Sequence, residues 1–312
     1  MRFSSSYLLA VVLPAALAAT AVAACSSTPR GTFDDPINGD AGDAGTSLPT
    51  DGGPKPPAFT DASLDAAKPG GPSEVFGHSG KVLYRLDPDT KSVQVIGTFS
   101  GCNEGSEQVI DIALDEASNM YGTTYTGLFR IDKATARCTR VTSSTGKDFP
   151  NSLSFVPKGT LDPADEALVG YVADEYVRID PANGNITTIG KLGNTQLRSS
   201  GDIVSVIGGP TYLTVKSTGA SGQCAASDCL VEIDPKTGAI TKNWGALNAR
   251  VDVFGVAFWA GSIYGFTKAG TLFQVEIKGG ALTLNEITIP QRPTDLSFFG
   301  AGSTTSAPTQ PK

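Results

Sequence analysis

Apolar and polar residues alternate along most of the chain after residue 75, and the alternation recurs in five similar segments. The first of them is Leu83-Tyr84-Arg85-Leu86-Asp87, in which an aliphatic residue directly precedes an acid. That aliphatic position falls at 86, 131, 179, 233 and 275, so the intervals are 45, 48, 54 and 42 residues. Alternation of this kind, with β-branched and aromatic neighbours, is typical of β-strands.

Turn residues follow the acid in each of the better conserved segments of the repeat. The pattern Asp-Pro-x-Thr-Gly at Asp234 favours a tight turn, because proline presets φ and glycine takes a left-handed conformation. A second alternating strand follows each turn, and two more precede each segment after the first, which has only one before it. The strands expected to be innermost cover residues 110–114, 153–155, 202–206, 254–258 and 295–299.

Four antiparallel strands that recur every 42–54 residues indicate the blades of a β-propeller. The first unit lacks its innermost strand, whereas the strand at 295–299 has no blade after it. If that strand pairs into the first unit, the ring closes and no sheet edge stays open. We therefore predict an all-β fold: a β-propeller of five four-stranded blades over residues 74–301, closed by a C-terminal strand that pairs into the first blade.

The repeats resemble the Leu-Tyr-x-Ile-Asp-Pro-x-Thr-Gly units of secreted bacterial β-propellers. This resemblance covers residues 76–300 and implies an architecture but no particular activity, since the fold hosts many unrelated functions. An open β-sandwich or two small sheets are the alternative architectures. They explain the five-fold pattern and its matching turn residues less well.

The N-terminus has the features of an export signal. Arg2 precedes a short apolar run and an alanine-rich stretch that ends at Ala24, which predicts a signal peptide over residues 1–24. The following Val22-Ala23-Ala24-Cys25 resembles the lipobox of bacterial lipoproteins. The resemblance implies that Cys25 is acylated and becomes the new N-terminus, so the lipid bilayer is the expected partner. Ser26 stands where inner-membrane retention requires aspartate, which favours the outer membrane.

Composition sets the two flanking segments apart from the repeats. Residues 25–73 are rich in Gly, Pro and Asp and poor in aromatic residues, which predicts a disordered tether. Residues 302–312 are similar and are predicted to be a disordered tail. The chain has 24 basic and 31 acidic residues, a net charge of −7, which argues against nucleic acid as a partner. A monomer is expected.

Four cysteines follow Cys25, and an even number in an exported domain indicates disulfides. Cys224 and Cys229 lie in one insertion of the fourth unit, and Cys102 lies in the loop that enters the unit containing Cys138. We therefore predict the pairs Cys102–Cys138 and Cys224–Cys229. A zinc site is disfavoured because the chain holds a single histidine.

Three aspartates are candidates for chemistry in the channel of the propeller. Asp111, Asp202 and Asp295 align on the innermost strands, where the other units have Ser152 and Gly255. Converging carboxylates can bind calcium or act as an acid/base pair. Alternatively, such aspartates accept hydrogen bonds from backbone amides of a neighbouring blade. Asn151 and Asp252 are expected near the same rim. No cofactor is expected unless calcium binds there.

Other catalytic signatures are missing from the sequence. His78 matches a variable strand position and is interpreted as a polar structural residue. No nucleophile elbow, P-loop or zincin motif occurs. Asp234 to Trp244 resembles a quinoprotein docking repeat, but the tryptophan is two residues too far on, so Trp244 and Trp259 are interpreted as packing residues.

Two functions are carried forward from these observations. The first is a lipid-anchored cell-envelope protein whose propeller is a non-catalytic binding or scaffold module for a polysaccharide, peptide or protein. The alternative is a hydrolase or lactonase-like enzyme that uses the channel carboxylates. An enzyme requires at least two carboxylates close together in an open pocket, whereas a binding module allows them to be tied to backbone amides.

Overall fold

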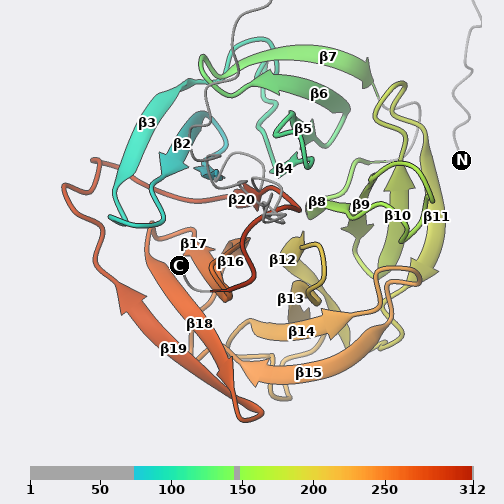
Figure 1. The fold of residues 1–312 in the computed structure, drawn as a ribbon, viewed down its shortest axis with the longest axis vertical. Helices are drawn as coiled ribbons and strands as arrows, with labels where there is room; N and C mark the ends of the chain where they lie inside the picture. Colours follow the sequence, from blue (N-terminus) through green and yellow to red (C-terminus); the bar gives the residue numbers. More distant parts are fainter. Residues whose placement is uncertain (1–73, 144–147, 311–312) are drawn as a thin grey trace, which may run out of the picture. The chain divides into compact units, whose positions relative to one another are not determined.

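The computed structural model describes residues 74–143 and 148–310, which form five four-stranded antiparallel sheets arranged as the blades of a ring (Figure 1). The predicted five-bladed β-propeller is confirmed. The predicted signal peptide, Cys25 and the predicted tether lie outside the described residues. Within the described part of the chain, no helix is long and apolar enough to cross a membrane.

Each blade is a meander whose strands run in order from the innermost to the outermost. The first blade consists of β20 (Gly300–Ser303), β1 (Val75–His78), β2 (Val82–Leu86) and β3 (Val93–Thr98). The other four blades comprise β4 (Asp111–Leu114), β5 (Met120–Thr124), β6 (Gly127–Asp132) and β7 (Arg137–Ser143); β8 (Leu153–Val156), β9 (Ala167–Val172), β10 (Glu175–Ile179) and β11 (Ile186–Lys191); β12 (Leu197–Ser205), β13 (Thr211–Ser217), β14 (Cys229–Ile233) and β15 (Ile240–Ala246); and β16 (Val253–Trp259), β17 (Ser262–Thr267), β18 (Leu272–Lys278) and β19 (Ala281–Ile287).

The strand that closes the ring differs from the predicted one. β20 pairs antiparallel with β1, with Ser303 opposite Val75 and Gly300 opposite His78. The predicted segment 295–299 lies just before it, and Asp295 has a left-handed φ of 59°. The closing strand must fit the narrow space beside Asp111. A Cβ on Gly300 would lie 2.3 Å from a carboxylate oxygen of Asp111, so the innermost position of the first blade admits only glycine there.

The predicted disordered tail is wrong for the part that the structure describes, residues 302–310. Thr304 and Thr305 are buried after β20. The amide of Ile207 donates to the carbonyl of Thr305, and the amide of Gly261 donates to that of Pro308. These bonds join the tail to the β12–β13 and β16–β17 turns, so backbone pairing holds a segment whose composition alone indicates disorder.

Apolar side chains fill the space between neighbouring blades. Between the second and third blades, for example, the rings of Tyr121 and Phe155 meet edge to face at 5.5 Å. Phe298, which precedes β20, packs edge to face on Phe266 of the fifth blade and Tyr84 of the first. The segment before the closing strand therefore contributes core packing where a strand was predicted.

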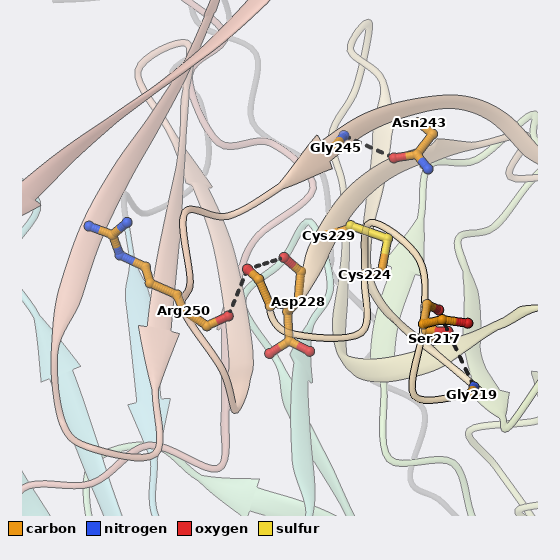
Figure 2. The surroundings of a disulfide bond; sticks show 10 residues. Ser217, Gly219, Cys224, Asp228, Cys229, Asn243, Gly245 and Arg250 are labelled. Carbon is orange, nitrogen blue, oxygen red and sulfur yellow. Dashed lines mark hydrogen bonds between the residues drawn. A yellow bond between two sulfur atoms is a disulfide. The ribbon is translucent and has the colours of Figure 1, made fainter.

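Both predicted disulfides form. Cys102–Cys138 joins the loop before β4 to β7 across 36 residues, and Cys224–Cys229 closes a short loop before β14 (Figure 2). The second bond fixes the segment that carries Asp228, whose carboxylate points away from the disulfide. Trp244 is half-buried and Trp259 is buried, and both pack against the core, which agrees with their interpretation as packing residues.

Candidate functional site

Each blade has one equivalent position within its innermost strand or directly before it, near one end of the channel. These positions are Asp111, Ser152, Asp202, Gly255 and Gly300. The residue before each of them lines a cavity of about 380 Å³, here called the mouth cavity: Ile110, Asn151, Gly201, Phe254 and Phe299. Every blade therefore contributes to the entrance of the channel.

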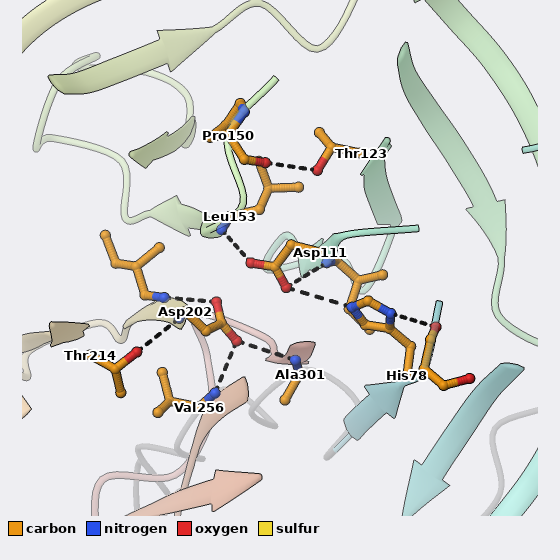
Figure 3. A network of polar contacts seen from close by, with 12 residues as sticks. His78, Asp111, Thr123, Pro150, Leu153, Asp202, Thr214, Val256 and Ala301 are labelled. Carbon is orange, nitrogen blue, oxygen red and sulfur yellow. Dashed lines mark hydrogen bonds and ion pairs between the residues drawn. The ribbon is translucent and has the colours of Figure 1, made fainter. Parts of the chain in front are cut away.

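Backbone amides occupy the carboxylates of Asp111 and Asp202 below the mouth cavity. Asp111 accepts hydrogen bonds from its neighbour Ile112 at 2.8 Å and from Leu153 of the next blade at 2.7 Å (Figure 3). Both carboxylates are completely buried. Asp111 thus joins the second blade to the third.

Asp202 makes the corresponding contacts from the fourth blade, and one more. It accepts hydrogen bonds from Ile203 at 2.7 Å, from Val256 of the fifth blade at 2.9 Å and from Ala301 of the closing strand at 3.2 Å. These contacts agree with the structural interpretation of a channel aspartate, as a group that accepts hydrogen bonds from the neighbouring blade.

The two carboxyl groups share a low-polarity environment. Burial raises the pKa of Asp111, and the nearby charge of Asp202 raises it further. Burial also raises the pKa of Asp202. Burial therefore favours the protonated form of both carboxyl groups, and the repulsion by Asp202 adds to this effect at Asp111.

His78 reaches the same centre from the first blade. Its Nδ1–H donates to the carbonyl of Ser79 at 2.9 Å, and Nε2 lies 3.7 Å from Asp111 Oδ1 (Figure 3). Burial lowers the pKa of His78 to about 4, so the imidazole is neutral. The approach to Asp111 is possible because Gly300, opposite His78, has no side chain. Sequence reasoning missed this contact because it depends on the identity of the closing strand.

The third predicted aspartate lies elsewhere. Asp295 is exposed, outside any strand, and five residues before the position equivalent to Asp111 and Asp202. The structure therefore does not bring together the three carboxylates from which a calcium site was predicted. Among residues 74–143 and 148–310, no group of three or more His, Cys, Asp and Glu side chains is arranged to hold a metal ion.

A second cavity of about 450 Å³, here called the side cavity, adjoins the mouth cavity and shares Tyr125, Asn151 and Phe254 with it. Asp252 lines the side cavity, so Asn151 and Asp252 both lie at the rim, as predicted. Tyr125, in the β5–β6 turn, has 58% of its surface exposed. Aromatic faces beside amide and charged groups suit a ligand with both apolar and polar surfaces.

Asp228 lines the side cavity and was not predicted. Its Oδ2 accepts a hydrogen bond from Val253 at 2.8 Å, and burial raises its pKa. Within the described residues, its Oδ1 has no hydrogen-bond partner, nor do the hydroxyls of Ser199 and Ser200. The sequence signal for Asp228 was its place beside Cys229. Its burial, however, depends on strands brought together from distant segments.

Comparisons with known proteins identify no family. No known protein family matches the sequence, and no curated protein matches it either. The nidogen/laminin complex contains a chain with a TM-score of 0.44 and 10% identity, covering 73% of this chain and 97% of that one. A protein of unknown function from Bacteroides caccae has a TM-score of 0.39 at 13% identity, covering 72% and 76% of the two chains.

An enzyme is also among the similar solved structures. The PQQ-bound aldose sugar dehydrogenase from Streptomyces coelicolor has a TM-score of 0.37 at 13% identity, covering 70% of this chain and 79% of that one. Likeness at this level does not transfer an activity. The fold and the cavities define a five-bladed β-propeller with an open, ligand-sized mouth cavity at one end of its channel.

Proposed function

We propose that this chain is a lipid-anchored protein of the cell envelope whose propeller binds a ligand at the mouth cavity without transforming it. One contrast supports the proposal. The cavity offers Tyr125, Asn151 and Phe254 to a ligand, whereas the carboxyl groups beneath it are buried and occupied by backbone amides. Binding surface and candidate acid/base chemistry are thus separated.

The position of Glu74 agrees with the same function. Ser118, in the β4–β5 turn, donates a hydrogen bond to Glu74, the first described residue. The mouth cavity lies at the other end of β4, beside Ile110. Glu74 therefore lies on the side of the propeller away from the cavity.

Anchoring at Cys25 is supported by the lipobox-like Val22-Ala23-Ala24-Cys25. Several acyl chains together give stable membrane association, which a single chain does not. The proposed place is the outer membrane, with a polysaccharide, peptide or protein of the envelope as the ligand and the chain as a monomer. No cofactor is needed for such a role.

The alternative, a hydrolase or lactonase-like enzyme, draws on the raised pKa values of Asp111 and Asp202, which suit a general acid. That chemistry requires a carboxyl group within hydrogen-bonding reach of a substrate in the cavity. Both groups have no exposed surface, so a substrate in the mouth cavity cannot touch them.

A binding and turnover experiment separates the two functions. The full chain in detergent micelles is incubated with material released from the envelope of the cells that produce the protein. The masses of the retained compounds are then measured by mass spectrometry. We expect unchanged compounds to be retained by the wild type and by Val95→Ala, an exposed residue of the outer strand β3, and to be lost with Tyr125→Ala. A product of altered mass that disappears with Asp202→Asn would establish the enzyme instead.

A further inference from the structure

Two cations face each other across the strands that form one wall of the side cavity. Arg198 on β12 and Lys216 on β13 are directly opposite in the antiparallel register, so their side chains lie on the same face of the sheet, and both line the cavity. Like charges at such a position disfavour folding. Among the described residues, neither side chain forms an ion pair with a carboxylate, although the charge of Lys216 acts on Asp228 and partly offsets the rise in its pKa that burial causes. Asp148 also lines the cavity. Arg198, which is in no ion pair among the described residues, can therefore pair with a negative charge supplied from outside.

The floor of the cavity holds polar groups that lack partners. Asp228 is fully buried and Ser199 is 6% exposed, yet Asp228 Oδ1 and the Ser199 hydroxyl make no hydrogen bond within the described part of the chain. Ser200 lies close enough to lower the pKa of Asp228, but its hydroxyl forms no hydrogen bond of ordinary geometry. Buried groups of this kind are normally satisfied by protein, water or ligand.

The remaining wall is aromatic and amphipathic. Tyr125 is a large hydrophobic side chain that is exposed in the cavity, and Phe254 meets Phe299 edge to face at 6.3 Å on the side shared with the mouth cavity. Asn151 and Asp252 also line this cavity. A flat apolar surface thus lies beside hydrogen-bonding groups and a positive wall.

From these groups we infer that the side cavity binds an acidic saccharide, a sugar unit that carries a carboxylate; this inference rests on the proposed function. The carboxylate lies between Arg198 and Lys216, where guanidinium and ammonium donors pair with it. Sugar hydroxyls both donate and accept, so they match Asp252, Asn151 and the serine hydroxyls. One face of the sugar ring packs on Tyr125.

An acidic peptide fits the same surface less well. Its carboxylates would be attracted by Arg198 and Lys216, but the neighbouring Asp252 and Asp228 would repel any that the cations do not hold. Hydroxyl groups carry no such charge and can satisfy carboxylates and serines alike. The mixture of signs in the cavity therefore favours a saccharide.

Calorimetric titration of the full chain in detergent micelles tests the inference. The probes are tetrasaccharides in which one mannuronate, glucuronate or galacturonate unit ends a chain of neutral sugars, each paired with its neutral carboxyl-reduced counterpart, and tetraglutamate. We expect at least one uronate to bind about tenfold or more tightly than its reduced counterpart, because charge-assisted hydrogen bonds are lost on reduction. Tetraglutamate should bind more weakly than that uronate.

Variants locate the site. Arg198→Gln and Lys216→Gln should each lower the affinity for the uronate about tenfold. Lys236→Gln, the same charge change in the β14–β15 turn of the same blade, should leave it unchanged. The inference is overturned if no uronate binds better than its reduced form, or if tetraglutamate binds as tightly. If neutral sugars bind and Tyr125→Ala abolishes that binding, the inference of an acidic ligand is wrong but the proposed binding function stands.

Discussion

Asp202 contacts more of the ring than any other channel residue described above, since it accepts backbone hydrogen bonds in the fourth blade, the fifth blade and the closing strand. Asp202→Ala would leave the amides of Ile203, Val256 and Ala301 without this acceptor. Each unpaired buried donor costs about 1–3 kcal/mol, so we expect the free energy of unfolding to fall by at least about 3 kcal/mol in urea titrations.

Ser152 provides the matched control for this variant. It occupies the equivalent position in the third blade, and its hydroxyl accepts one hydrogen bond, from the amide of Tyr171 at 2.8 Å. Ser152→Ala should therefore cost less than Asp202→Ala, about 1–3 kcal/mol. Equal losses for the two variants would contradict the joining role of Asp202.

The raised pKa values of Asp111 and Asp202 predict a pH dependence of stability. Because the folded state holds a proton more tightly than the unfolded chain, this contribution is complete below the ordinary aspartate pKa and is lost as pH rises through the folded value, about 8 for Asp202. His78 acts in the opposite sense. Its pKa is lowered to about 4, so its contribution is present above pH 6.5 and is lost as pH falls towards 4.

Measurement above pH 6.5 therefore isolates the carboxyl groups from His78. We expect the free energy of unfolding of the wild type to decrease from pH 6.5 to 8.5, and Asp202→Asn to show a shallower decrease because one of the two groups no longer titrates. Urea titrations at several pH values measure both slopes. Parallel slopes would show that the pair does not hold a proton in the folded state.

At this scale the sequence located some site residues and missed others. The repeat register aligned Asp111 with Asp202 correctly, because each occupies the same place in a regular strand. It placed Asp295 with them because 295–299 resembles the other innermost strands in its apolar pattern. Asp228 could not be found, since its burial depends on the disulfide-closed loop and on Val253, which the fold brings to it.

Among the elements, β20 shows how tertiary fit can outweigh strand propensity. Its sequence, Gly-Ala-Gly-Ser, is a weak strand former. It closes the ring because small residues are required where it passes Asp111 and His78. The pair Phe299-Gly300 matches Phe254-Gly255 of the fifth blade, and that signal could have identified the closing strand from the sequence.

Gly300→Ala tests the closing strand directly. The added Cβ would lie 2.3 Å from both Asp111 Oδ1 and His78 Nε2, so the strand must shift and the ring must open or strain. We expect a loss of at least about 1–3 kcal/mol in the free energy of unfolding, as for overpacked cores. Gly219→Ala, in a loop where the new Cβ meets nothing within 4 Å, should leave stability nearly unchanged. Similar stability of both variants would contradict the closure by β20.

For the whole molecule, the two ends of the channel have different surroundings. The tail after β20 is bonded to the β12–β13 and β16–β17 turns, on the side where Glu74 contacts Ser118. The mouth and side cavities are at the opposite end. The repeat period was enough to predict the number of blades. The difference between the two ends could not be predicted, because it arises from loops and termini whose sequences do not repeat.

Anchoring is tested on the whole protein in cells. Cys25→Ala should move the protein from the membrane fraction to the soluble exported fraction, because the acyl chains supply the membrane affinity. Mass spectrometry of the wild type should find the lipid on the N-terminal peptide. Unchanged membrane retention of the variant, or an unmodified Cys25 in the wild type, would contradict the proposed anchor.

The most direct test of ligand binding at the open end is hydrogen–deuterium exchange of the full chain, with and without saccharides released from its own envelope. Bound ligand should slow exchange in peptides that contain Tyr125 and Phe254, which line both cavities, and a ligand in the side cavity should also slow it at Arg198 and Lys216. The β14–β15 turn at Lys236, at the other end of the same blade, should exchange as before. Protection at that turn alone, or no protection at all, would contradict a binding site at the channel mouth.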